Sequence, residues 1–152
     1  SSTWSINLGT GTVIVVDDTW QHWVYTSAGI TGGTTTLYID GSSVATGTGK
    51  TMVSTPNPVK LTLATAPATT SRVTCKFDEV AIFDDVLTGS EVSAIWNSGA
   101  PTDISGHDHL HSYWRMGDGV GDTGTFIRDQ KGYWDLNGAE GTPVIDTSDV
   151  PT

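Results

Sequence analysis

Apolar and polar side chains alternate with a period of two along much of this chain, which is the pattern of half-buried β-strands. The alternation is clearest at residues 4–8 and 59–63, residues 12–16 form a β-branched run, and residues 20–26 and 34–39 are also expected to be strands. A glycine-rich break between the first two of these segments in chain order predicts a hairpin of residues 4–8 with 12–16. The pattern therefore predicts an all-β protein.

Turn signals separate the central strands. Asp40-Gly41 stands between residues 34–39 and 42–45, and this dipeptide between β-forming runs predicts a tight hairpin. Residues 46–58 are rich in Gly, Thr and Pro, which predicts a surface excursion rather than a strand.

The strand expected from Arg72 to Phe83 changes character half-way. Val73, Cys75 and Phe77 share one face, so the alternation predicts that Cys75 is a buried small hydrophobe. From Glu79 onward both faces are apolar, so either both faces are covered or a bulge near Asp78-Glu79 changes the register. Two acidic groups at such a point need hydrogen bonds or a cation as partners.

One short helix is expected near residues 89–97. Residues 87–91 read Leu-Thr-Gly-Ser-Glu, which is a capping box in which Thr88 and Glu91 satisfy each other's backbone N–H groups. Val92, Ile95 and Trp96 then share one helical face, and Asn97-Ser98-Gly99 supplies a stop.

Two motifs resemble the laminin-G-like jelly roll of the concanavalin A-like lectin/glucanase family. In that family a Phe/Ile-Asp-Glu-Val strand leads into Leu-Ser/Thr-x-x-Glu-Ile/Val, as residues 77–92 do here. A second family pattern, Trp-x-His-Val-Ala-x-Thr followed by Leu-Tyr-Val-Asp-Gly, is matched by residues 20–26 and 37–41, with Trp23 and Val24 in place of Val-Ala. The resemblance implies a two-sheet antiparallel jelly-roll sandwich.

The C-terminal part resembles the opening strands of the same family. Residues 113–119 read Tyr-Trp-Arg-Met-Gly-Asp-Gly, and the likeness extends over residues 113–140, after a linker-like stretch at 99–112. The block either completes a sandwich, within this chain or between neighbouring chains, or begins another unit. We expect completion, with residues 1–152 as a single domain that forms part of a longer protein.

Charge excludes two classes of partner. The chain has 17 acidic and 7 basic residues, for a formal net charge of −10, so it offers no basic stripe for nucleic acid and no attraction to an anionic membrane surface. No apolar run approaches a membrane span. One cysteine allows no internal disulfide, which leaves the redox compartment open.

No catalytic motif stands out, so we expect that the chain is not an enzyme. Glucanases of the superfamily carry a Glu-x-Asp-x-x-Glu strand motif that this sequence lacks, and only Glu79, Glu91 and Glu140 exist. Gly117 to Gly121 lacks the spacing and the following helix of a dinucleotide-binding loop.

Two metal sites are conceivable. Carboxylates on Gly-rich loops suit calcium, which the family resemblance also implies, and the candidates are Asp78, Asp118, Asp122 and Asp129. The alternative for these residues is a turn role. His107, His109 and His111 would share one side of an extended backbone and could bind a transition metal, or they belong to a polar linker.

Aromatic side chains supply the candidate ligand contact. Tyr133, Trp134 and Asp135 are the expected glycan site, because exposed aromatic faces stack on sugar rings; a sheet-edge or subunit contact is the alternative. Residues 96–118 resemble units of phage virion proteins, which implies a structural or adhesive role in a tail fibre or capsid decoration. The partners would then be other virion subunits, further copies of the chain, or cell-surface glycans. A carbohydrate-binding module of a secreted bacterial protein, with an extracellular location, is the rival expectation.

Overall fold

The protein is built of antiparallel strands with one short helix, as the sequence predicts. The computed structural model describes residues 5–7, 12–14, 19–29, 31–51, 75–123, 126–132 and 136–137. The strand expected at residues 59–63 and the candidate site Tyr133, Trp134 and Asp135 lie outside the described residues. Within the described residues, no helix has both the length and the apolar character needed to cross a membrane.

A three-stranded sheet forms the centre of the fold. It consists of β3 (Trp23–Ser27), β4 (Thr31–Ile39) and β5 (Ser42–Thr51), in that order and antiparallel. The expected hairpin is confirmed: Ile39 pairs with Ser42, and both residues of the Asp40-Gly41 turn have positive φ angles of 50° and 74°. These angles match the primed turn that an Asp-Gly pair favours.

Strand β5 is longer than the sequence predicts. The excursion expected from residue 46 is wrong as far as residue 51, because β5 continues to Thr51 and pairs along β4, with bulges that let the two strands stay in contact. β-branched Thr compensates for the interspersed Gly, which on its own weakens a strand.

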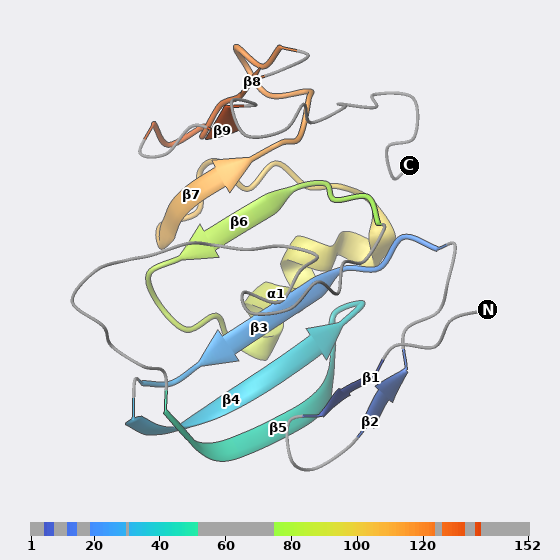
Figure 1. The fold of residues 1–152 in the computed structure, drawn as a ribbon, viewed down its shortest axis with the longest axis vertical. Helices are drawn as coiled ribbons and strands as arrows, with labels where there is room; N and C mark the ends of the chain where they lie inside the picture. The colour runs from blue at the N-terminus through green and yellow to red at the C-terminus, as the bar shows by residue number, and fades with distance from the viewer. Residues whose placement is uncertain are drawn as a thin grey trace.

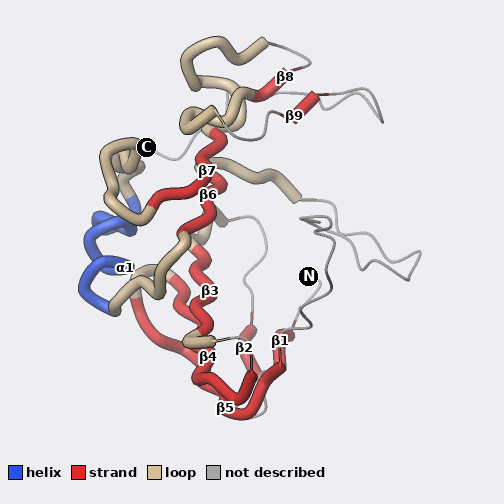
Figure 2. The backbone as a smooth tube through the Cα atoms, turned by 90° about the vertical axis from the view of Figure 1, so that its left-hand side faces the viewer, coloured by secondary structure: helices blue, strands red, loops and turns tan. Residues whose placement is uncertain are grey.

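A second sheet joins two segments that are far apart in the sequence. Strand β6 (Val80–Phe83) pairs antiparallel with β7 (Leu110–Trp114). In two perpendicular views the strands follow the order β7, β6, β3, β4, β5, so the two sheets form one curved layer (Figures 1 and 2). The short strands β8 (Phe126–Ile127) and β9 (Leu136–Asn137) pair with each other beyond β7.

The layer is covered on both sides. The N-terminal hairpin of β1 (Ser5–Asn7) and β2 (Thr12–Ile14), which confirms the predicted pairing, lies on one side, where β2 contacts β5. Helix α1 (Gly89–Trp96) lies on the other side (Figure 2). The two-sheet sandwich is thus visible in part, as the curved layer and the hairpin against it.

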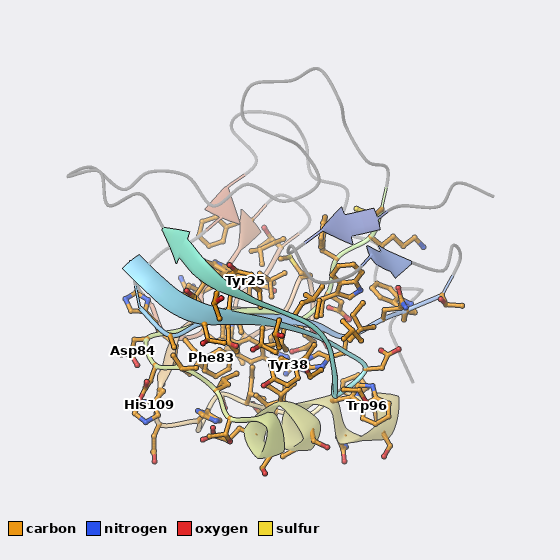
Figure 3. All side chains as sticks on the ribbon, turned by 90° about the horizontal axis from the view of Figure 1, so that it is seen from below. Tyr25, Tyr38, Phe83, Asp84, Trp96 and His109 are labelled. Carbon is orange, nitrogen blue, oxygen red and sulfur yellow. The ribbon has the colours of Figure 1, made fainter. Side chains whose placement is uncertain are left out.

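The alternation along β4 explains how one strand serves both sides. Leu37 and Ile39 are buried in a cluster with Ala45 and the partly buried Trp23. Tyr38 points the other way, toward α1, where it lies beside Gly89 (Figure 3). A strand covered on both faces reads as a continuous apolar run, which accounts for Leu-Tyr-Ile at this point.

Helix α1 begins and ends as the sequence predicts. The Thr88 hydroxyl accepts the N–H of Glu91 at 3.3 Å, and the Thr88 N–H donates to the Glu91 carboxylate at 2.7 Å. Asn97 caps the C-terminus in the left-handed conformation, and Val92 is fully buried. A short 3₁₀ turn, η1 (Asn97–Gly99), follows.

Helix α1 also contacts the β4–β5 turn. A Cβ atom on Gly41 would approach Trp96 Cε3 to 2.8 Å, so the turn lies directly against the indole of the last helical residue (Figure 3). Position 41 requires glycine for two reasons, the positive φ angle and the close approach of the Trp96 ring.

A second core cluster joins β6 and β7 to the helix. Ile104, Leu110 and Tyr113 are buried together, with Ala81, Phe83 and Ile95 packed against them. The prediction that Cys75 is buried is wrong, because it lies in a non-strand segment before β6 and is exposed. The alternation through residues 73–77 therefore did not mark a strand in residues 75–77.

Candidate functional site

The site begins at the register change expected near Asp78-Glu79. Glu79, just before β6, has a φ of 51°, and its N–H donates to Asp78 Oδ1 at 3.0 Å. A left-handed residue interrupts the alternation of side chains, so Glu79 turns toward the neighbouring strand β7. This break separates the exposed segment 75–77 from the partly buried strand β6.

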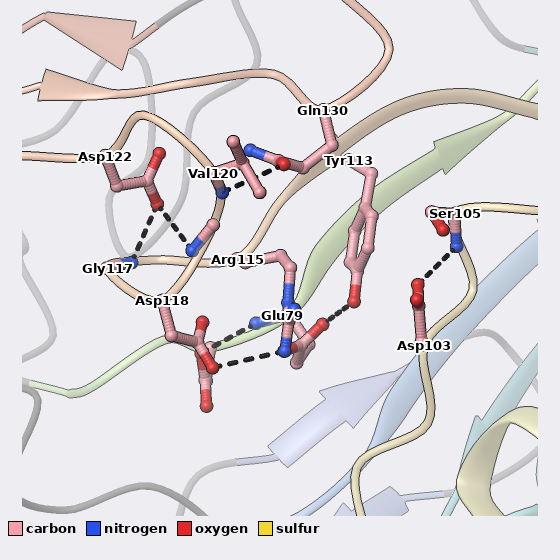
Figure 4. A network of polar contacts seen from close by, with 12 residues as sticks. Glu79, Asp103, Ser105, Tyr113, Arg115, Gly117, Asp118, Val120, Asp122 and Gln130 are labelled. Atoms are coloured by element: carbon pink, nitrogen blue, oxygen red, sulfur yellow. Dashed lines mark hydrogen bonds and ion pairs between the residues drawn. The ribbon is translucent and has the colours of Figure 1, made fainter.

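Strand β7 and the turn after it supply the partners of Glu79. The Tyr113 hydroxyl donates to Glu79 Oε2, and Arg115 Nε lies 3.3 Å from Glu79 Oε1 (Figure 4). Met116 and Gly117 both have positive φ, and the turn that they form returns Asp118 to the guanidinium, where its Oδ2 lies 3.2 Å from Arg115 Nη2. We call Asp78, Glu79, Tyr113, Arg115 and Asp118 the Glu79 cluster.

Burial sets the electrostatics of this cluster. Loss of solvent raises the pKa of Glu79 to about 7, although the charge of Arg115 and its hydrogen bond act in the opposite direction. Burial likewise raises the pKa of Asp78, partly offset by the hydrogen bond from the Glu79 N–H. Neighbouring Asp118 adds to both increases, because like charges disfavour ionisation.

The structure brings together two of the four aspartates predicted to bind calcium. Oxygen atoms of Asp78, Glu79 and Asp118 all lie within 4.8 Å of one another, and among the described residues they form the one group of three acidic or metal-ligating side chains at such spacing. Glu79 was not among the predicted ligands, since the sequence placed it in the strand corner.

The other two predicted ligands hold backbone N–H groups. Asp122 Oδ2 accepts from Gly117 and Gly119 at 3.1 and 3.2 Å, and its Oδ1 accepts from Arg128 at 2.7 Å (Figure 4). Asp129, at 1 % exposure, accepts from the N–H groups of Tyr113 and Lys131 through Oδ1, both at 2.9 Å. These carboxylates shape the turns that follow β7.

Three carboxylates at this spacing are donors of the type that calcium prefers. The competing feature is Arg115, whose guanidinium already pairs with two of the three, Glu79 and Asp118. The donor set therefore fits a hard cation, and Arg115 would weaken its binding by supplying a positive charge at the same place.

The three alternating histidines do not lie along one extended strand, although the rings of His107 and His109 are 6.5 Å apart. His107 lies in a turn with its ring edge-on to Phe83, and His109 lies 3.5 Å from Asp84 (Figure 3). Only His111 is on β7, where Nδ1 is 3.0 Å from Ser112 Oγ. The prediction of an extended His face is wrong, because the chain turns between Ile104 and Leu110, where two backbone hydrogen bonds close the loop.

Sequence reasoning missed Glu79, Tyr113 and Arg115 as a group. Two features of the sequence could have indicated this group. Asp78 and Glu79 are adjacent acidic residues that need polar partners, and the spacing of Tyr113 and Arg115 puts them on one side of an extended chain. What the sequence could not give was the pairing of β6 with β7, which sets Tyr113 opposite Ala81.

Comparison with known proteins identifies the class. The sequence model of the laminin G-like family described as the concanavalin A-like lectin/glucanases superfamily matches residues 1–93, and the chain belongs to this family. Its class is accordingly that of carbohydrate-binding or adhesive modules. Neither the curated proteins nor the solved structures include a significant match.

Proposed function

We propose that the chain is a non-catalytic adhesive or structural module of a virion surface protein, with a lectin-like capacity for cell-surface glycans. Membership of the family supports the binding class. The sequence of residues 96–118, which resembles units of phage tail fibres and capsid decorations, supports the virion role. The partners would be other virion subunits or further copies of this chain.

The structural roles of Glu79 and Glu91 support the non-catalytic part of the proposal. Glycoside hydrolysis needs two carboxyl groups that flank the bond to be cut. Here Glu79 is engaged by Tyr113 and Arg115, and Glu91 closes the capping box of α1. Each of these two carboxylates therefore already has a structural role.

A hydrolysis assay tests this reading, since the raised pKa of Glu79 is a property that a general acid also needs. Purified protein would be incubated with β-glucans and chitin fragments, and reducing ends would be measured. We expect no release above that of a Glu79→Gln variant. Release that the wild type shows and this variant lacks would overturn the proposal.

Glycan contact is proposed at Tyr133, Trp134 and Asp135. Aromatic side chains next to a carboxylate offer a stacking face and a hydrogen-bond acceptor to a sugar. A glycan array of the wild type and Trp134→Ala would test the site, with Trp20→Ala as the control, because Trp20 is an exposed tryptophan distant from residue 134 in the sequence. Loss of binding in both variants, or in neither, would contradict this location.

The second candidate function is a carbohydrate-binding module of a secreted bacterial protein, favoured by the family match alone. The two candidates differ in self-association and in genetic context. Binding to bacterial-surface polysaccharide by an oligomer would support the virion proposal. Binding to plant or fungal glucans by a monomer would support the secreted module.

Calcium at the Glu79 cluster remains a proposal, supported by the spacing of the three carboxylates. Terbium luminescence and calcium competition would measure it. Because Arg115 competes for two ligands, we expect Arg115→Gln to tighten binding and Asp118→Asn to abolish it. Equal affinities in the wild type and both variants would exclude the site.

A further inference from the structure

Strand β7 is deeply buried although it comes from outside the part of the chain that the family model matches. The match ends at residue 93, within α1, whereas β7 begins at Leu110. Ser112 and Tyr113 are fully buried, Trp114 is 2 % exposed and Leu110 is 5 % exposed. Such burial is typical of an integral core strand and not of a linker.

Residues 107–123 and 126–132, called the β7 segment below, dock as one folded unit. Asp129 accepts the N–H of Tyr113, and the Gln130 N–H donates to the Tyr113 carbonyl oxygen at 2.8 Å, so the returning chain brackets β7. Trp114 and Asp129 also form a β-bridge. These contacts lie within the segment and would persist if the segment moved as a body.

A compact set of contacts attaches this segment to the rest of the chain. β7 pairs with β6 from Val80 to Phe83, and Leu110 and Tyr113 pack into the cluster that includes Ile95. The Tyr113 hydroxyl and Arg115 both bind Glu79, at the far end of the same edge. The β6 edge thus recognises its partner by strand pairing, apolar packing and one carboxylate.

The exposed part of the covalent connection, residues 97–101, plays little role in this docking, whereas Ile104 further along packs with Leu110 and Tyr113. Residues 97–101 are exposed, and Asn97, Ser98 and Gly99 have φ angles of 45°, 59° and 90°. A short exposed connection with left-handed residues can be redirected without loss of the contacts that it joins.

We propose that the β6 edge is a strand-acceptor surface whose ligand is the β7 segment, held within the same chain here and exchangeable with the β7 segment of a second copy. The mode is β-strand addition, in which backbone pairing provides affinity and the apolar packing of Leu110 and Tyr113 provides specificity. Exchange remakes identical contacts and therefore costs little apart from association entropy. The proposal is independent of glycan binding and of a virion role.

Cleavage of the intact protein at the exposed connection tests the first half of the proposal. A protease site inserted after Gly99 would be cut in the folded protein, and the product would be analysed by size exclusion in buffer and in denaturing urea. We expect the two fragments to co-elute in buffer and to separate only in urea. Immediate separation after cleavage would overturn the proposal.

Exchange between copies is measured on the same cleaved protein. Unlabelled and heavy-isotope-labelled samples would be mixed, brought briefly to mild denaturant and returned to buffer, and native mass spectrometry would follow. Complexes of mixed mass are the expected result. Fragments that stay associated and yield only the parental masses would show that the segment is not exchangeable.

Matched variants separate strand recognition from general adhesion. Tyr113→Ala removes the buried ring, and we expect the fragments to associate roughly 100-fold more weakly or worse. Val120→Ala truncates an 83 % exposed side chain in the same segment and should leave association unchanged. Equal weakening by both variants would contradict the assigned surface.

Discussion

Glu79 is a carboxylate whose ionisation the fold opposes. Burial raises its pKa from 4.5 to about 7, so the folded protein holds this proton more tightly than the unfolded chain does. The stability that the group contributes is fully present below pH 4.5 and is lost as the pH rises through about 7. One pKa unit corresponds to about 1.4 kcal/mol, so the penalty at pH 8 is at most about 3 kcal/mol and is reduced by solvent that reaches the partly exposed side chain.

We therefore expect Glu79→Gln to gain stability relative to the wild type as the pH is raised from 5 to 8, measured by urea unfolding at each pH. The control is Glu91→Gln, because the hydrogen bonds from Thr88 lower the pKa of Glu91. The difference in the free energy of unfolding between Glu91→Gln and the wild type should change only below about pH 4.5. A Glu79→Gln difference that does not vary with pH would refute the prediction.

Asp129 stabilises the chain around β7 through its acceptor oxygen. Removing it leaves the buried N–H of Tyr113, and that of Lys131, without their carboxylate partner. We expect Asp129→Ala to lower the free energy of unfolding by about 3 kcal/mol and Asp129→Asn, which retains an oxygen, by about half of that. Chemical denaturation of both variants checks this, and equal losses would show that the charge and not the acceptor matters.

Residue-level expectations succeeded where local chemistry decides the outcome. Asp40-Gly41 and the Thr88–Glu91 pair adopt the predicted conformations, because a turn and a cap depend on neighbouring residues alone. The prediction that Cys75 is buried is wrong for the opposite reason. Its burial depended on the strand that would have carried it, and that strand begins only at Val80, after the left-handed Glu79.

At the scale of elements, the cap of α1 offers a clean measurement. Thr88→Ala removes the hydroxyl that accepts the Glu91 N–H, and we expect a loss of about 1 kcal/mol. Ser90→Ala, an exposed substitution within the first turn, is the control and should change stability by less than about 0.5 kcal/mol. The urea midpoint at constant slope reports both values, and equal shifts would argue against a specific cap.

Elements were predictable in proportion to how local their pairing is. The β1–β2 and β4–β5 hairpins follow from turn residues between alternating runs. The β6–β7 pair links residues about thirty apart in sequence, and no local signal specifies its register. The Glu79 cluster depends on that pair, so the sequence revealed two of its three acidic members, Asp78 and Asp118, but not their arrangement.

At the scale of the whole molecule, surface charge opposes compactness. A formal net charge of −10 on 152 residues implies mutual repulsion that salt screens. We expect the melting temperature to rise by a few degrees between low-salt buffer and physiological ionic strength, measured by calorimetry. Potassium chloride should reproduce the effect of sodium chloride, and a fall in either salt would show that ion pairs such as Arg115–Glu79 outweigh the repulsion.

The exposed thiol at residue 75 matters for any study of how copies of this chain assemble. Oxidation by air can join two molecules through a disulfide between their Cys75 thiols. Size exclusion would then show a dimer that does not arise from strand addition. A Cys75→Ser background, or reductant throughout, removes this artefact. The same thiol, a few residues from the acceptor edge, can carry a fluorescent label that reports arrival of the incoming strand.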